Sequence, residues 1–202
     1  GVANVESWNG SSWTETTDVN NARQGMGGSG TSTSTLVFGG YDGSRRAYTE
    51  YWNGSSWTEL NDLSTGKSNP GGVGTAYNTA LCFGGSTPSN TAQTESFDGT
   101  SWTELNDLNT ARNIAGGSGT STAGLAYSRA PFPTGNTESW DGTSWTEVAD
   151  LATARYGVAS SPSGTSQLAL ASGGYTTTQV SNTEEWSFPP PTSAVLTEGD
   201  VF

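Results

Sequence analysis

Apolar residues in this chain come in short runs bounded by glycine and asparagine, and no segment shows a helical period. Within residues 20–64 these runs predict four strands, at 25–30, 33–38, 48–52 and 56–60. The second run stops at Gly39 and Gly40, and Asn53 and Gly54 separate the last two runs. Asparagine and glycine tolerate the positive φ of a tight turn, so the last two strands should form a hairpin.

The same pattern returns along the whole chain. The unit at residues 8–15, Trp-Asn-Gly-Ser-Ser-Trp-Thr-Glu, recurs unchanged at 52–59 and in variant form at 97–104 and 140–147. The first aromatic residues of successive units, 44, 45, 43 and 46 residues apart, are Trp8, Trp52, Phe97, Trp140 and Trp186. Four short antiparallel strands repeated with a period of about 45 residues are typical of propeller blades. We therefore predict an all-β protein, a β-propeller of four-stranded antiparallel blades, over residues 1–188.

The two ends of the chain carry further expectations. Proline cannot donate to a strand ladder, so Pro189–Pro191 should end the propeller, and 189–202 should form a proline-rich exit segment that docks on another module or subunit. The chain opens in the middle of a unit, which suggests a piece of a longer protein. Either 158–172 pairs with 5–15 to close a four-bladed ring, or further blades exist. We favour the longer propeller, because a strand at 183–188 would be surplus in a four-bladed ring.

Conspicuous residues at fixed places in each unit point to one propeller family. The glycine pairs that end the apolar strand are Gly39-Gly40, Gly84-Gly85 and Gly173-Gly174, and the basic residues ahead of each unit are Arg23, Lys67, Arg112 and Arg155. This arrangement resembles the kelch repeat over residues 1–188. The Trp-Asn-Gly units are also similar to kelch-type repeat arrays in structural proteins of marine bacteriophages. The third unit has Ser128 and Arg129 in place of the glycine pair, so we expect its turn to be built differently.

Composition removes several classes of partner. The chain has a net charge of −12 with seven basic residues, so it lacks the cationic patch that nucleic-acid or anionic membrane binding requires. No apolar run is long enough to span a bilayer, and we expect no membrane insertion. Cys82 takes the place that Val37 and Ala126 occupy in sibling units, which predicts a small buried residue rather than a reactive thiol.

The absence of histidine limits catalysis. Ser-His-Asp and Cys-His arrangements and imidazole metal sites cannot form, and this also excludes the copper chemistry of galactose-oxidase-like kelch propellers. A glutamate recurs in every unit, as Glu6, Glu50, Glu95, Glu138 and Glu184. Because a residue present in every blade suits a structural role, we predict that these carboxylates pair with the recurring basic residues or with backbone donors. No catalytic residue, metal or cofactor is predicted.

Binding residues should lie where the repeats differ. The loops after the glycine pairs have unrelated sequences, yet each joins the same two strands and should emerge on the same face. The candidate binding residues on these loops are Tyr41, Arg45, Arg46, Arg129, Phe132 and Tyr175. Loops that vary only because nothing constrains them remain the alternative.

These observations predict a non-enzymatic structural and binding module. The phage resemblance implies an appendage, tail-fibre or decoration protein in the virion, with other virion proteins or a host-surface receptor or glycan as partners. The alternative is a secreted or cell-surface glycan-binding propeller of a bacterium. A weaker one is a carbohydrate-active enzyme that uses carboxylates alone. Self-association into a homo-oligomer is left open.

Overall fold

The computed structural model describes residues 1–113, 115–128, 135–161 and 165–187, and these form antiparallel sheets joined by turns. Three sheets have four strands each. The first consists of β3 (Gly27–Thr31), β4 (Ser34–Phe38), β5 (Thr49–Trp52) and β6 (Trp57–Leu60), and the second of β7 (Gly71–Val73), β8 (Ala80–Phe83), β9 (Thr94–Phe97) and β10 (Trp102–Glu104). The third consists of β11 (Gly116–Gly119), β12 (Gly124–Tyr127), β13 (Thr137–Trp140) and β14 (Trp145–Val148). A hairpin of β1 (Glu6–Trp8) and β2 (Trp13–Glu15) precedes them, and a three-stranded sheet of β15 (Ala159–Ser160), β16 (Leu168–Ser172) and β17 (Thr183–Ser187) follows.

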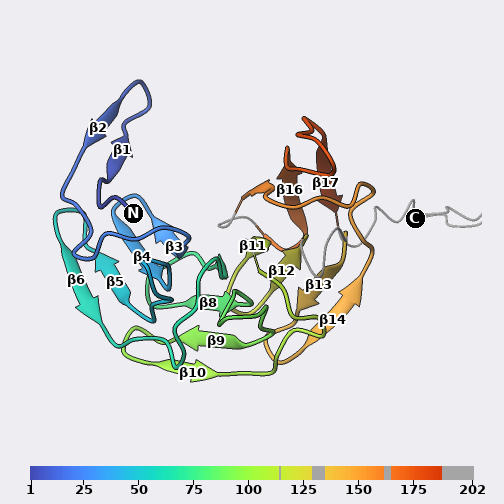
Figure 1. Ribbon diagram of the computed structural model, residues 1–202, viewed down its shortest axis with the longest axis horizontal. Helices are drawn as coiled ribbons and strands as arrows, with labels where there is room; N and C mark the ends of the chain where they lie inside the picture. The colour runs from blue at the N-terminus through green and yellow to red at the C-terminus, as the bar shows by residue number, and fades with distance from the viewer. Residues whose placement is uncertain (114, 129–134, 162–164, 188–202) are drawn as a thin grey trace, which may run out of the picture.

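The sheets follow one another along an arc in the arrangement of a β-propeller (Figure 1). The fourth strands β6, β10 and β14 lie on the outer rim, and the glycine-rich first strands lie toward the centre. Within the described residues, β15 pairs with β16, β16 pairs with β17, and none of them pairs with the β1–β2 hairpin, so the four-bladed closure is not formed. The expected all-β propeller of four-stranded antiparallel blades is confirmed.

Each outer hairpin turns through the same side-chain contact. In the first complete sheet Trp52 pairs with Trp57, and the Asn53 Oδ1 atom accepts the backbone N–H groups of Ser55 and Ser56 at 2.9 Å each. Asp98 and Asp141 make the same contacts in the next two sheets. The alternation of asparagine and aspartate between units therefore preserves one turn.

Glycine fills the first strands because these strands approach one another closely. A Cβ atom placed on Gly72 of β7 would lie 2.7 Å from the carbonyl oxygen of Gly28 on β3. A Cβ atom on Gly117 of β11 would lie 2.8 Å from the Cγ1 atom of Val73. The glycine-rich strand predicted at 25–30 thus allows a close approach between neighbouring blades.

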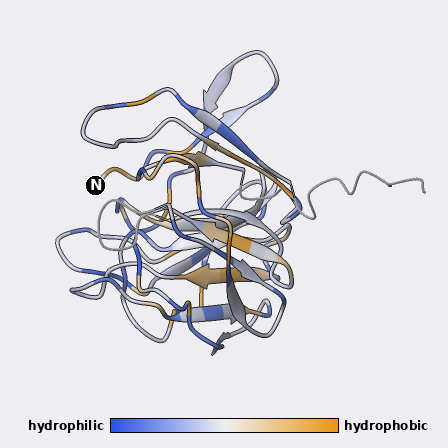
Figure 2. Ribbon diagram, turned by 90° about the vertical axis from the view of Figure 1, so that its right-hand side faces the viewer, coloured by the Kyte–Doolittle hydropathy of each residue, from blue (hydrophilic) through white to orange (hydrophobic). Residues whose placement is uncertain are grey.

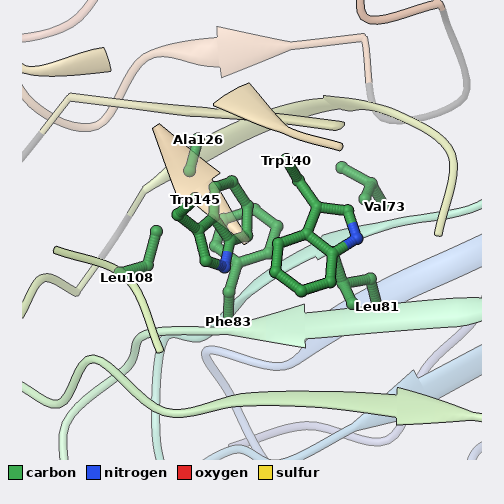
Figure 3. Packing of buried hydrophobic residues seen from close by; sticks show 7 residues of the cluster. All are labelled: Val73, Leu81, Phe83, Leu108, Ala126, Trp140 and Trp145. Atoms are coloured by element: carbon green, nitrogen blue, oxygen red, sulfur yellow. The ribbon is translucent and has the colours of Figure 1, made fainter. Parts of the chain in front are cut away.

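The hydrophobic core is divided into layers between successive sheets. Figure 3 shows the middle layer, in which Trp140 lies against Leu81 and Val73 and Trp145 lies beside Phe83 and Ala126. Hydrophobic strand segments lie inside the stack of sheets (Figure 2). Cys82 is buried in the preceding layer, which confirms the small buried residue expected at this place, and burial raises the pKa of its thiol to about 12.

The third unit differs from expectation. Ser128 takes the place of Gly39 and adopts the same left-handed conformation, with φ of 69° against 68° for Gly39. Its hydroxyl donates a hydrogen bond to the carbonyl oxygen of Arg155 in the next linker. This contact fixes a conformation that serine ordinarily avoids, so the first residue of the turn is not built differently. The exit segment 189–202 lies outside the described residues.

Candidate binding face

In three of the sheets, the loop between the strand that ends at Phe38, Phe83 or Ser172 and the next strand begins at a glycine pair. Gly39 and Gly40 have φ of 68° and 113°, which is the left-handed region that glycine enters without strain. The N–H of Gly40 donates to the carbonyl oxygen of Lys67 in the following linker at 2.9 Å. The first two loops are therefore anchored on the next blade at their bases, as Gly85 is on Arg112 at 2.7 Å.

Three of these loops share one backbone conformation. Their first and fifth residues form the isolated bridges Tyr41–Arg45, Ser86–Asn90 and Tyr175–Gln179. In each loop, the residue after the bridge donates its N–H to the carbonyl oxygen of the second glycine. These hydrogen bonds join Arg46 to Gly40 at 2.9 Å, Thr91 to Gly85 at 2.9 Å and Val180 to Gly174 at 3.0 Å. The backbone is thus constrained in all three, and the loops differ in their side chains.

In the first loop, Arg46 and Asp42 form an ion pair with each other, whereas the side chain of Tyr41 is exposed. The Arg46 Nε atom donates to both carboxylate oxygens of Asp42 at 2.9 Å, and its guanidinium lies 5.4 Å from the ring centre of Tyr48. The hydrogen bond from Arg46 lowers the pKa of the Asp42 carboxyl and raises that of Arg46. Arg46 is thus engaged within its own loop, whereas the Tyr41 ring is 38% exposed.

Arg45 reaches across to the second loop. Its Nη2 atom donates to the Ser86 Oγ atom at 3.4 Å and to the Pro88 carbonyl oxygen at 3.3 Å. Beside Arg45 lies a hollow between the first loop and two linkers, and its lining is Gln24, Gly25, Tyr41, Arg45, Ser68 and Asn69. The candidates Tyr41 and Arg45 are therefore brought together in one depression.

Sequence reasoning missed three polar residues of this hollow, namely Gln24, Ser68 and Asn69. Gln24 and Ser68 each follow a recurring basic residue, and they form bridges with the first loop residues Tyr41 and Ser86. The position after the basic residue differs in every unit, and this variation is the signal that could have found them.

The other candidates are not part of this hollow. Tyr175 lies on the last sheet, is 36% exposed, and has its ring centre 5.2 Å from that of Tyr156. Tyr156 follows the basic residue Arg155, so it occupies the same place as Gln24. The last loop thus carries a pair of tyrosine rings. Arg129 and Phe132 lie outside the described residues.

Four of the five recurring glutamates form ion pairs with the recurring basic residues, as predicted, whereas Glu6 forms none among the described residues. The pairs are Arg23–Glu50, Lys67–Glu95, Arg112–Glu138 and Arg155–Glu184. In the second of them the Lys67 Nζ atom lies 2.8 Å from a Glu95 oxygen, and both side chains are fully buried. The other Glu95 oxygen accepts the backbone N–H of Ser64 at 2.8 Å. Each pair therefore fastens an incoming linker to the third strand of its blade.

Two further findings concern metal ligands and membrane spans in the described part of the chain. No group of three or more acidic, cysteine or histidine side chains there could hold a metal ion. Nor does a helix long and apolar enough to cross a membrane occur among the same residues. In comparisons with known proteins, no protein-family model and no curated protein matches this chain.

Proposed function

We propose that this protein is a non-enzymatic structural and binding module whose recognition surface is the face formed by the loops after the second strands. The observation that carries the proposal is the common backbone of three loops whose side chains differ. A rigid frame that presents variable side chains is the usual construction of a protein recognition surface. Four of the five recurring glutamates are engaged in ion pairs, which favours binding over carboxylate catalysis.

The setting we propose is a bacteriophage particle, in which the chain forms a kelch-like appendage, tail-fibre or decoration protein. The resemblance of the Trp-Asn-Gly units to phage repeat arrays supports this setting, as does an acidic, lysine-poor surface without disulfides. Its partners would be other virion proteins or a receptor or glycan on the host surface.

A glycan-binding propeller on a bacterial surface is the second candidate. The exposed ring of Tyr41 beside Arg45, Gln24 and Asn69 supports it, because sugars stack on aromatic rings and accept hydrogen bonds from amide and guanidinium groups.

A binding experiment tests the recognition surface. Fluorescently labelled protein is applied to a glycan array and to bacterial cells, and the Tyr41→Ala/Tyr175→Ala variant is compared with wild type. We expect the double variant to lose most of the signal. The matched control is Asn53→Asp, which lies in an outer turn and has aspartate in its sibling units. Equal binding by all three proteins would refute the loop face as the binding surface.

A second experiment separates the two settings. An antibody against the repeat units is applied to particle and cell-envelope fractions of the source culture. Labelling of virus-sized particles supports the phage setting, and labelling confined to envelopes supports the bacterial one.

A further inference from the structure

Three hydrophobic layers between successive sheets contain similar residues at equivalent positions. The second strand of the preceding sheet contributes a leucine and, two residues later, an aromatic ring, in the pairs Leu36/Phe38, Leu81/Phe83 and Leu125/Tyr127. In two of these layers the following sheet contributes aromatic residues from its third and fourth strands, such as Trp140 and Trp145 in Figure 3, and in the last layer it contributes Trp186 from its third strand. These three layers define what a filled interface contains.

A groove lies between the β1–β2 hairpin and the first complete sheet. In the part of the chain that the structure describes, it has the aromatic residues of a following sheet but lacks the leucine and aromatic ring of a preceding sheet. Its wall includes Val37, Trp52 and Trp57, which occupy the same register positions as Cys82, Phe97 and Trp102 in the next sheet. Trp102 lies against Phe38, with ring centres 5.0 Å apart. Within the described residues, no leucine-and-aromatic strand covers Trp57 in the corresponding way.

The hairpin beside the groove is the outer half of a blade. Its register pairs Glu6 with Glu15 and Trp8 with Trp13, as β5 and β6 pair in the first complete sheet. There β5 lies between β4 and β6, whereas β1 pairs with β2 alone in the described part of the chain. One edge of β1 is therefore open, and Trp8 and Trp13 are 49% and 64% exposed.

In the described ranges, Glu6 of the hairpin lacks the ion-pair partner that its counterparts in the complete sheets have. Its counterparts Glu50, Glu95 and Glu138 are buried in ion pairs with a basic residue. In every unit that basic residue precedes the first strand by four positions, as Arg23 precedes Gly27. Glu6 is exposed and has no ion pair among the described residues. The hairpin thus lacks both the inner strands and the charge partner that belong to them.

We propose that this groove is a docking site for the inner two strands of another blade of the same repeat type, supplied from outside these 202 residues. The docking segment pairs with the open edge of β1 by strand addition. Its leucine and aromatic side chains fill the groove against Trp52 and Trp57. A basic residue four positions ahead of its glycine-rich strand pairs with Glu6. This binding function is separate from that of the loop face.

The test uses the chain's own inner hairpin as the probe. A labelled peptide with the sequence of residues 20–40 contains the basic residue, the glycine-rich strand and the leucine-and-aromatic strand. We expect saturable binding to the full chain by fluorescence anisotropy. The peptide with Leu36→Ser and Phe38→Ser should not bind.

A charge exchange locates the peptide on the protein. Glu6→Arg in the protein should weaken binding roughly tenfold, and Arg23→Glu in the peptide should restore it to that variant. The matched control is Glu104→Arg, because Glu104 is an exposed strand glutamate on β10 of the second complete sheet and does not line the groove.

Three results would overturn the proposal. The first is no binding, and the second is binding that Glu6→Arg leaves unchanged. The third is hydrogen exchange of the peptide-free protein in which β1 amides are as protected as those of β5. That protection would mean that residues 188–202 fill the groove or, if sedimentation shows a dimer, that a second copy does so through its exposed Leu168 and Leu170.

Discussion

Trp102 lies edge-on against Phe38 of the preceding sheet, with ring centres 5.0 Å apart and planes at 70°. The same indole donates its N–H to the Oγ1 atom of Thr49, also in the preceding sheet, at 3.0 Å. Trp145 repeats both contacts with Phe83 and Thr94 one blade later. One side chain therefore supplies apolar area and a satisfied polar contact across each of these two blade interfaces.

Truncation of such a tryptophan should be costly only where a neighbouring blade covers it. We expect Trp145→Ala to lower the free energy of unfolding by about 3–5 kcal/mol, because it removes a buried ring and leaves a cavity. Trp13→Ala changes the corresponding residue of the open hairpin and should cost less than about 1 kcal/mol. Urea denaturation of both variants measures the difference, and equal losses would contradict the layered core.

Removal of one partner from a buried ion pair should destabilise the fold. In Glu95→Gln the Lys67 ammonium stays buried without its counter-charge, so we expect a loss of about 3 kcal/mol or more. The control Glu59→Gln changes an exposed carboxylate and should stay within about 0.5 kcal/mol of wild type. If Glu95→Gln unfolded at the same urea concentration as Glu59→Gln, the pair would have no structural role.

Gly72 and Gly28 both lie on inner strands, but only Gly72 lies too close to a neighbouring strand to admit a side chain. Substitution of each by alanine therefore shows whether close approach or strand propensity decides the effect on stability. In Gly72→Ala the new methyl group would meet the Gly28 carbonyl oxygen at 2.7 Å, and the first strands must move apart at a cost of about 1–3 kcal/mol. In Gly28→Ala the nearest atom is 3.5 Å away, so this variant should be neutral or slightly stabilised. Thermal denaturation of both variants checks the order, and the reverse order would contradict the packing around the centre.

Two buried groups should make the protein sensitive to alkali. Burial raises the pKa of Cys82 from 9.0 to about 12 and that of Tyr127 from 10.0 to about 12. Between the unfolded and folded pKa values the native state holds more protons than the unfolded state, so stability falls as pH rises. Their contributions are complete below about pH 9 and are lost as pH approaches 12.

The measurement is the urea midpoint at a series of pH values from about 8 to 11. Cys82→Ala is the matched variant, because the third unit has Ala126 at this place. In this variant the urea midpoint should fall less steeply at the lower pH values of the series, where Cys82 causes the decline. The decline that Tyr127 causes at higher pH should remain. A wild-type midpoint that does not change over this range would show that neither group is buried in solution.

The repeat made the fold predictable, because features shared by all units had to have a shared structural cause. The strand order, the outer turn at Asn53 and the partners of Glu50 and Glu95 all followed from comparison of one unit with another. The comparison failed where a contact occurs in one unit only. Nothing in the sequence indicated that Arg46 would pair with Asp42 or that Ser128 would adopt a left-handed conformation.

Only part of the hollow on the candidate binding face could be predicted from the sequence. Variation among the loops indicated Tyr41 and Arg45, which do share a hollow. Gln24 and Asn69 reach that hollow from the linkers through backbone bridges and turns that depend on how two blades meet. Such contacts arise from packing between units, and no single unit contains the information.

The common backbone of the loops has a consequence for how this protein can diversify. Residues 41–45, 86–90 and 175–179 are equivalent inserts between the same two hydrogen-bonded ends. An insert from one blade can replace that of another without a change of chain length or of the frame. Specificity can therefore evolve, or be engineered, by exchange of five-residue cassettes while the stability of the scaffold is selected separately.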